Sequence, residues 1–312
     1  MTRPTQSRQT IDFMVGIPTS TAPPHPKQPQ AIIPFDAARF ATLMSTRKLE
    51  LGQPLVSRAT TRSTNDDLLD IAATGAPHGT VVQADFQTHG RGRHGRRWSS
   101  PRPAENLLFS VLLRPDSEFG KISGITLAIG LAVRQAVQPL VDAPVLVKWT
   151  NDIYVRERKL AGILVETRFR GNFPTAIVVG VGINVHARQF EDEVSQLATS
   201  LDLLGAKPVR LEDLLADVLE QIALQTARWK SRGVSGILEE WRKYDALAGR
   251  QIKWDGRHGI ARGIDSDGAL LVETHADGPL ERVTRAGITL LPATADGEVE
   301  ERHTEFGGLS DG

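Results

Sequence analysis

A segment rich in glycine and arginine is the part of this sequence best suited to bind an anion. Residues 90–97 contain four arginines and three glycines, and they follow an apolar run. Glycines let backbone N–H groups approach an anion, and the planar guanidinium group matches phosphate or carboxylate oxygens. Solvated loops and nonspecific RNA contacts have a similar composition. The Walker pattern is absent from the sequence, and the glycines lack Rossmann spacing.

Three further segments place a polar or cationic side chain beside an apolar run. Lys148, Asn151 and Asp152 form the first, where a lysine could meet a phosphate and a carboxylate could hold Mg²⁺ or orient the lysine. Lys159 begins an apolar run and needs a partner or a chemical task, because burying an unpaired charge is costly. Asn184 ends another such run. Each segment also has a structural alternative. Residues 148–152 could form a polar turn, Lys159 could extend its ammonium group to solvent, and Asn184 could simply be the turn residue that ends a strand.

The overall composition excludes several classes of function. Its 37 basic and 37 acidic residues give a formal net charge of zero, which argues against a surface built entirely for nucleic acid. The absence of cysteine excludes disulfides, cysteine nucleophiles and thiolate metal sites, and it fits the cytoplasm as a reducing compartment. No apolar run approaches the about 18 residues expected of a membrane span, so no membrane partner is expected.

The four segments are carried by a pattern of strands and helices, which predicts an α+β domain at residues 35–247. Apolar runs predict strands at 55–59, 80–86, 107–113, 145–149, 153–155, 159–169 and 176–185. Helices are expected after the caps Asp36 and Ser63, and at 122–137, 211–230 and 236–244. One apolar face of the fourth helix is predicted to contain Leu214, Leu215, Val218, Ile222 and Leu224.

The two ends and the C-terminal part of the chain differ from residues 35–247 in amino-acid composition. Asp-Gly turns split residues 248–292 into short β-like runs, which predicts a small β-barrel domain. Residues 1–34 are rich in proline and are expected to form a disordered leader. Residues 293–312 are acidic and are expected to form a disordered tail.

Five segments in this order resemble the motifs of biotin protein ligases. Residues 90–98 are similar to the family signature Gly-Arg-Gly-Arg-x-Gly-Arg-x-Trp. The other four segments are Ser63-Thr64-Asn65, Lys148-Trp-x-Asn-Asp152, Lys159-x-x-Gly-Ile-Leu and Gly-x-Gly-Ile-Asn184. The resemblance covers about residues 36–292. It implies a mixed-sheet catalytic domain of the biotin/lipoate ligase type that binds biotin and ATP, followed by a small C-terminal SH3-like β-barrel.

The resemblance also implies roles for individual residues. Those implied to contact biotin are Ser63, Thr64, Asn65, Gln87, Arg91, Gly92, Arg93 and Lys159. Those implied to contact the nucleotide are Arg91, Arg93, Trp98, Lys148, Asn151 and Asn184. Lys159 and Arg93 are the implied catalytic residues, and Asp152 is the implied metal position. ATP and Mg²⁺ are the implied cofactors, with biotin as the substrate.

The reaction that this resemblance implies has two steps. The biotin carboxylate attacks the α-phosphate of ATP to give biotinyl-5′-AMP and pyrophosphate. A specific lysine of a carrier protein then attacks the acyl carbonyl and releases AMP. Both steps bring anions together, so they need positive charge around the reacting centre. The expected carrier is the biotin carboxyl carrier domain of an acetyl- or acyl-CoA carboxylase, and the expected assembly is a monomer or homodimer.

Two positions depart from the family pattern. Thr150 stands where the family commonly has proline, which would fix φ near −65° and make this turn rigid. Many members have a C-terminal-domain arginine that reaches the nucleotide, and the corresponding stretch 286–292 contains none. Arg285 lies nearby, but the role is not transferred to it.

Three alternative functions are weighed against this interpretation. A lipoate ligase shares the fold and the adenylate chemistry, but the arginine/glycine signature and the appended β-domain favour biotin. A repressor ligase needs an N-terminal winged helix, for which the Pro-rich leader lacks helical periodicity, so a monofunctional ligase without DNA binding is expected. An RNA-binding protein would interleave aromatic residues with the loop, and only Phe86 and Trp98 flank it. His89 and His94 have no evident third metal ligand.

Overall fold

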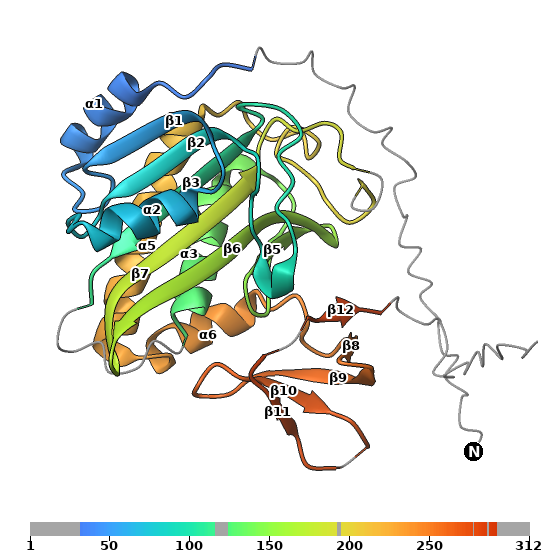
Figure 1. The fold of residues 1–312 in the computed structure, drawn as a ribbon. Coiled ribbons are helices and arrows are strands. Elements are labelled where there is room, and N and C mark those ends of the chain that lie inside the picture. Colours follow the sequence, from blue (N-terminus) through green and yellow to red (C-terminus); the bar gives the residue numbers. More distant parts are fainter. Residues whose placement is uncertain (1–31, 116–123, 192–194, 277, 286, 292–312) are drawn as a thin grey trace, which may run out of the picture.

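The computed structural model describes residues 32–115, 124–191, 195–276, 278–285 and 287–291. They form a seven-stranded mixed sheet with helices and a five-stranded antiparallel sheet (Figure 1). This arrangement confirms the predicted α+β class with a small all-β unit at the C-terminal end. The predicted tail and all but residues 32–34 of the predicted leader lie outside the described residues. Among the described helices, none is long and apolar enough to cross a membrane.

The large sheet has the strand order β1-β2-β3-β7-β6-β5-β4. β1 and β2 run parallel, and the other neighbours are antiparallel. All seven strands lie within a few residues of their predicted positions. Their bounds are β1 Leu55–Thr61, β2 Val81–Gln87, β3 Asn106–Leu113, β4 Val145–Lys148, β5 Asp152–Val155, β6 Arg158–Arg170 and β7 Phe173–Asn184.

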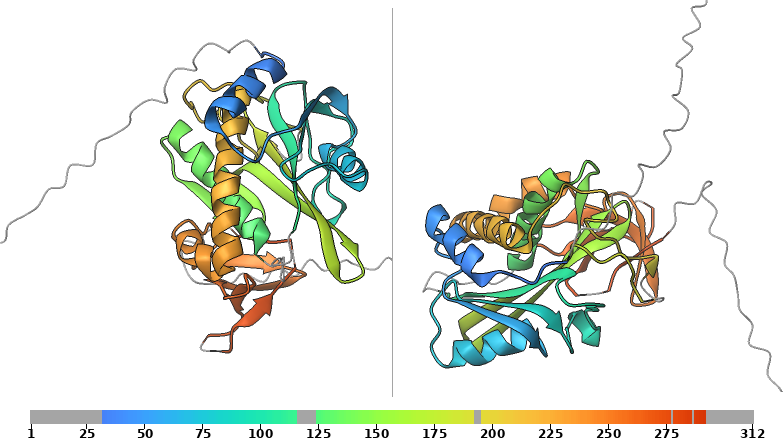
Figure 2. Two further views of the ribbon diagram at one scale, coloured as in Figure 1. Left: turned by 90° about the vertical axis from the view of Figure 1, so that its left-hand side faces the viewer. Right: turned by 90° about the horizontal axis from the view of Figure 1, so that it is seen from above.

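Helices cover both faces of this sheet. Figure 2 shows α2 on one face and α3 with α5 on the other. Successive strand residues point to opposite faces, so Val82 of β2 packs with α2 whereas Val81 belongs to the larger core around α3 and α5. The helices are α1 Ala37–Arg47, α2 Thr64–Ala73, α3 Ile125–Val137, α5 Leu211–Arg232 and α6 Ser235–Lys243, with short 3-10 turns η1 Arg93–Gly95 and η2 Gln138–Leu140.

The apolar face of α5 corrects one sequence prediction. Leu214, Leu215, Val218 and Ile222 are buried as expected. Leu224 is 52% exposed, so its predicted place on this face is wrong. Each helical residue turns about 100°, and Leu224 therefore points roughly 200° away from Ile222.

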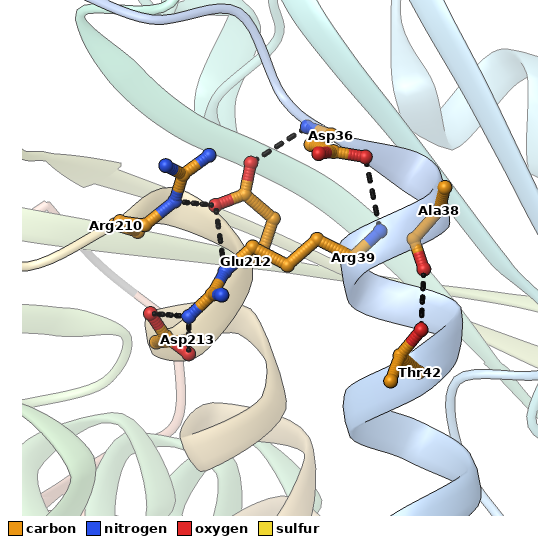
Figure 3. A network of polar contacts seen from close by, with 7 residues as sticks. All are labelled: Asp36, Ala38, Arg39, Thr42, Arg210, Glu212 and Asp213. Atoms are coloured by element: carbon orange, nitrogen blue, oxygen red, sulfur yellow. Dashed lines mark hydrogen bonds and ion pairs between the residues drawn. The ribbon is translucent and has the colours of Figure 1, made fainter.

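A buried carboxylate fixes α1 against the start of α5 (Figure 3). The carboxylate of Glu212 accepts hydrogen bonds from the backbone N–H of Asp36 at 2.6 Å and from Arg210 at 3.0 Å. Arg39 of α1 pairs with Asp213 at 2.8 Å. Asp36 also caps α1 by accepting a hydrogen bond from the backbone N–H of Arg39, as predicted. These charged groups hold one helical layer together at the edge of the core.

The C-terminal sheet packs beside the end of β4. Its strands are β8 Gln251–Trp254, β9 Arg257–Ile264, β10 Leu270–Glu273, β11 Glu281–Val283 and β12 Thr289–Leu290. Positive φ angles at Asp255 and Gly256 build the predicted β8–β9 hairpin turn. Trp149 donates a hydrogen bond from Nε1 to the carbonyl oxygen of Gly268 at 2.9 Å, which ties this sheet to the large one. The exact domain boundaries expected at 35, 247 and 292 stay predictions.

Candidate active site

The sequence-predicted residues converge on a cavity of about 290 Å³ beside β5, β6 and β7. Its floor comes from β6 and β7, and its walls come from the arginine/glycine loop, the β4–β5 turn and the start of α2. The predicted site residues that line it are Ser63, Thr64, Asn65, Gln87, Arg91, Gly92, Arg93, Trp98, Lys148, Asn151, Asp152 and Lys159.

Asn184 is the exception among the predicted site residues. Its side chain is buried and donates a hydrogen bond from Nδ2 to the carbonyl oxygen of Thr199 at 2.9 Å. It is not among the described residues that line the cavity. The structure therefore does not bring Asn184 to the cavity, and its contact with adenine stays a prediction.

Lys159 has the partner that its position at the start of an apolar strand requires. Its Nζ lies 2.7 Å from Oδ1 of Asp152, which begins the neighbouring strand β5. The antiparallel pairing of β5 with β6 brings these two residues together. This ion pair holds the ammonium group at the wall of the cavity, where a polyanionic ligand can compete with Asp152 for it.

Lys148 is the most deeply buried cation at the site. It is 8% exposed, and its Nζ lies 3.2 Å from the hydroxyl oxygen of Tyr154. Burial lowers the pKa of Lys148 from 10.5 to about 8, although the charge of Asp152 acts in the opposite direction. Burial also raises the pKa of the Tyr154 hydroxyl, which leaves that group protonated. Lys148 thus keeps most of its charge near neutral pH, and an anion in the cavity would stabilise that charge further.

Arg93 reaches the β4–β5 turn from the arginine/glycine loop. Its Nη1 donates hydrogen bonds to Thr150 Oγ1 at 2.6 Å and to Asn151 Oδ1 at 3.3 Å. Burial lowers the pKa of Arg93, the charge of Asp152 raises it, and the charge of Arg285 lowers it again. Thr150, which departs from the family pattern, therefore gives Arg93 a hydroxyl acceptor that proline lacks. The Trp149–Thr150 peptide bond is cis.

A hydrogen-bonded polar cluster forms the opposite wall at the start of α2. Gln87 Oε1 accepts hydrogen bonds from the backbone N–H of Thr64 at 2.8 Å and from its hydroxyl at 3.1 Å. Ser110 Oγ lies 2.8 Å from Thr64 Oγ1 and 2.6 Å from Asn65 Oδ1. Ser63 occupies the N-cap position, but its side chain makes no capping bond within the described structure. Its hydroxyl can therefore serve a ligand.

Two glycines in the cavity floor make room for the ring of Trp98. Gly162 of β6 and Gly182 of β7 face each other in register. A Cβ atom would lie 2.8 Å from the Trp98 ring at Gly162 and 2.5 Å at Gly182. The absence of side chains at these two positions therefore lets the Trp98 ring lie against the floor of the cavity. The Nζ atom of Lys159 lies 5.7 Å from the centre of the same ring.

Sequence reasoning missed several cavity residues. Tyr154 follows Asp152 by two positions on β5, so strand alternation could have placed it on the same face. Leu197 reaches the cavity because its carbonyl oxygen accepts a 2.7 Å hydrogen bond from the backbone N–H of Lys159. Gly287 and Ile288 come from the C-terminal unit. Long-range contacts place these last three residues. The resemblance had drawn attention to the stretch 286–292 only because it lacks the arginine of the family.

Comparisons with known proteins identify the family and agree with the fold. Residues 57–184 match the model of the Biotin/lipoate A/B protein ligase family. The chain is 35% identical over 224 residues to the Biotin–[acetyl-CoA-carboxylase] ligase of Mycobacterium tuberculosis, covering 69% of this chain and 81% of that one. It is 31% identical over 231 residues to the Bifunctional ligase/repressor BirA of Bacillus subtilis, covering 72% and 71%.

The fold of the chain is also similar to that of a solved structure. The fold matches the biotin protein ligase from Aquifex aeolicus in complex with biotin and ATP, with a TM-score of 0.67 and 28% identity, covering 77% of this chain and 99% of that one. The fold and the lined cavity thus define a protein of the biotin/lipoate ligase class. Within that class, the chain belongs to the biotin protein ligase family.

Proposed function

We propose that this protein is an ATP-dependent biotin ligase. It forms biotinyl-5′-AMP and then transfers biotin to a specific lysine of a biotin carboxyl carrier domain of an acetyl- or acyl-CoA carboxylase. The observation that carries the proposal is the single cavity that joins the arginine/glycine loop, two lysines and the polar start of α2. Family membership and the relative that binds biotin and ATP support the same activity.

The first step needs positive charge where the biotin carboxylate meets the α-phosphate. Lys159, Lys148 and Arg93 line the cavity and can stabilise the charge that develops at this centre. Asp152 holds Lys159 in place at 2.7 Å, so part of the ordering entropy is lost before substrates bind. A site that also holds the biotin carboxylate against the α-phosphate can lower the barrier by up to about 7–11 kcal/mol in favourable systems.

Biotin recognition falls to the opposite wall. The Ser63 hydroxyl lines the cavity without a capping bond and can hydrogen-bond a polar group of biotin. Gln87 and Thr64 hold each other through two hydrogen bonds, so they present a fixed surface rather than a mobile one. Leu164 and Val181 add apolar lining for the hydrocarbon part of biotin.

The second step uses the carrier lysine as the nucleophile. Its amine attacks the acyl carbonyl, the bond between the acyl carbon and the phosphate oxygen breaks, and AMP leaves. The mixed anhydride also reacts with water, so a loop that covers it would preserve it for the carrier. The arginine/glycine loop lines the cavity and is tied to the β4–β5 turn by the hydrogen bond from Arg93 to Thr150, so it has the position to do so.

The residues present fit a magnesium ion that is held mainly by phosphate oxygens. Asp152 supplies a cavity carboxylate, and its Oδ1 already pairs with Lys159. Among the described residues, no group of three or more His, Cys, Asp or Glu could hold a metal alone. Mg²⁺ is commonly bound by one or two carboxylates together with substrate phosphates. Asp152 would hold it here, and the ion would offset the charge of the triphosphate.

We also propose that the protein acts as a ligase without a repressor function. Before β1, the described residues contain one helix, α1, which packs against α5 rather than forming a separate module. A gel shift with the full chain tests this proposal, and a specific DNA complex would overturn it. The cytoplasmic location and the choice between monomer and homodimer stay predictions.

The decisive experiment measures transfer of labelled biotin to a carrier domain. The expected result is ATP-dependent label on one lysine, identified by mass spectrometry, and none on a carrier whose acceptor lysine is replaced by arginine. A parallel reaction with lipoate discriminates the related activity. Transfer of lipoate without biotin would assign the chain to lipoate ligation, and transfer of neither would refute ligase activity.

A further inference from the structure

One arginine of the loop is held by protein carboxylates rather than left for a ligand. Nη2 of Arg91 lies 2.6 Å from Glu166 Oε2 on β6 and 2.7 Å from Asp66 Oδ1 in the first turn of α2. By contrast, Arg93 donates to the neutral oxygens of Thr150 and Asn151. The two arginines of the signature therefore have different electrostatic environments.

The same carboxylate oxygen also fixes Asn65. Asn65 Nδ2 donates to Glu166 Oε2 at 2.7 Å and to the carbonyl oxygen of Leu164 at 3.3 Å. Its Oδ1 accepts from Ser110 at 2.6 Å. The side chain is 4% exposed, and Oδ1 lies so close to Gly180 that an added Cβ there would be only 2.1 Å away. All the polar atoms of the Asn65 side chain are thus engaged within the protein.

We propose that Glu166 is a positioning residue that couples the arginine/glycine loop to the polar wall at the start of α2, which contains Thr64 and Asn65. This inference rests on the proposed ligase function. Backbone hydrogen bonds make the loop behave as a unit: Trp98 N donates to the carbonyl oxygen of Gly90 at 2.9 Å, and Gly92 N donates to that of Arg96 at 2.7 Å. Fixing Arg91 therefore fixes the strand of the loop from which Arg93 extends.

This coupling gives different functions to side chains that the family motifs placed together in one binding site. Arg91 and Asn65 act through position, because their polar groups are already taken by Glu166, Asp66 and Ser110. Arg93 keeps its charge for the anionic ligand. Glu166 is itself 27% exposed on its side chain, so the ion pair is partly screened, and its loss should loosen the loop without unfolding the sheet.

The test compares Glu166→Gln with the wild-type chain and with Glu239→Gln, a matched loss of charge at a side chain that is 92% exposed on α6. Trypsin cleavage after Arg93, Arg96 or Arg97, identified by mass spectrometry, reports loop mobility in the free enzyme, because these three sites remain in every variant. For an interaction of this strength and exposure, cleavage is expected to be about five-fold faster in Glu166→Gln. The KM for biotin should rise by about the same factor while kcat changes less.

Asp66→Asn separates the two functions of the network. It removes the second carboxylate from Arg91 but leaves Asn65 held by Glu166. Faster loop cleavage is therefore expected, with a smaller rise in the KM for biotin than in Glu166→Gln. Equal effects of both variants on that KM would overturn the coupling through Asn65.

A double variant shows whether Glu166 acts through Arg91. If it does, Glu166→Gln should add little to the faster cleavage of Arg91→Met, as expected for residues in one network. Fully additive effects, or unchanged cleavage in Glu166→Gln, would overturn the proposal. Should Glu166→Gln fail to fold, Arg91→Met probes the same ion pair from the loop side. The cleavage assay needs no biotin, so it decides the role of Glu166 even if the wild-type chain transfers none.

Discussion

Replacing Lys148 by methionine is expected to stabilise the ligand-free protein while weakening its binding of ATP. Lys148 is 8% exposed at the end of β4 and carries a positive charge near neutral pH. Burial lowers its pKa from 10.5 to about 8, so the folded chain holds that charge at a cost. Methionine has a similar length and no charge, so it removes the cost together with the contact to the triphosphate.

The size of the effect follows from the difference between the two pKa values. Each pKa unit corresponds to about 1.4 kcal/mol, so at neutral pH the buried charge lowers the free energy of unfolding by about 3 kcal/mol. Methionine also loses the 3.2 Å hydrogen bond to Tyr154, worth about 1 kcal/mol. The net expectation is a gain of about 2 kcal/mol in the free energy of unfolding.

The pH dependence gives this prediction its sign. Between about pH 8 and 10.5 the unfolded chain binds a proton at Lys148 that the folded chain has released, so wild-type stability rises with pH in this window. The methionine variant lacks this term. Its advantage should therefore be largest near neutral pH and should shrink as the pH approaches about 10.

Urea unfolding of both proteins at several pH values measures this difference. Lys253→Met serves as the control, because Lys253 is exposed on β8 and its loss should change stability little. ATP should raise the stability of the wild-type protein more than that of Lys148→Met. The reasoning is refuted if Lys148→Met is less stable than the wild-type protein at neutral pH, or if the difference does not shrink as the pH rises.

Four other substitutions test the remaining parts of the site. Arg93→Ala should release biotinyl-5′-AMP faster and lose specificity for the carrier lysine, and unchanged retention of labelled adenylate would count against the covering loop. Lys159→Ala should stop adenylate formation, so pyrophosphate release at the wild-type rate would show that its assignment is wrong. Thr150→Val removes the 2.6 Å acceptor of Arg93 and should speed adenylate loss less than Arg93→Ala does; a larger effect would contradict the order of contacts. Gly182→Ala places a Cβ 2.5 Å from the Trp98 ring, so urea unfolding should show a loss of about 1–3 kcal/mol from overpacking, and the KM for ATP should rise; an unchanged protein would argue that the ring moves freely.

The order of strands and helices along the chain was accessible from sequence because it depends on local patterns. Apolar runs bounded by turn residues predicted every strand of the large sheet to within a few residues. The prediction for Leu224 was wrong because it did not apply the turn of about 100° per helical residue, which already points Leu224 away from the face that holds Ile222.

The site, too, contains residues that the sequence indicated correctly and one whose contacts only the structure shows. The ordered family motifs led to Arg93, Lys148 and Lys159, because the residue types alone were also consistent with solvated or structural positions. The sequence did not show that Asn184 turns toward Thr199 instead of the cavity, because that depends on a neighbouring loop.

By itself, the sequence determined the family motifs, the class of fold and the cations that line the cavity. Only the tertiary structure decided how each of these side chains is used. The register of β6 against β7 sets Gly162 opposite Gly182 and opens the floor to Trp98. The tertiary structure pairs Arg91 with Glu166 of β6 and Asp66 of α2, whereas Arg93 donates to the neutral oxygens of Thr150 and Asn151. Residue types can be read from the sequence, but the partners of these side chains are distant in the chain and meet only when the strands and helices pack.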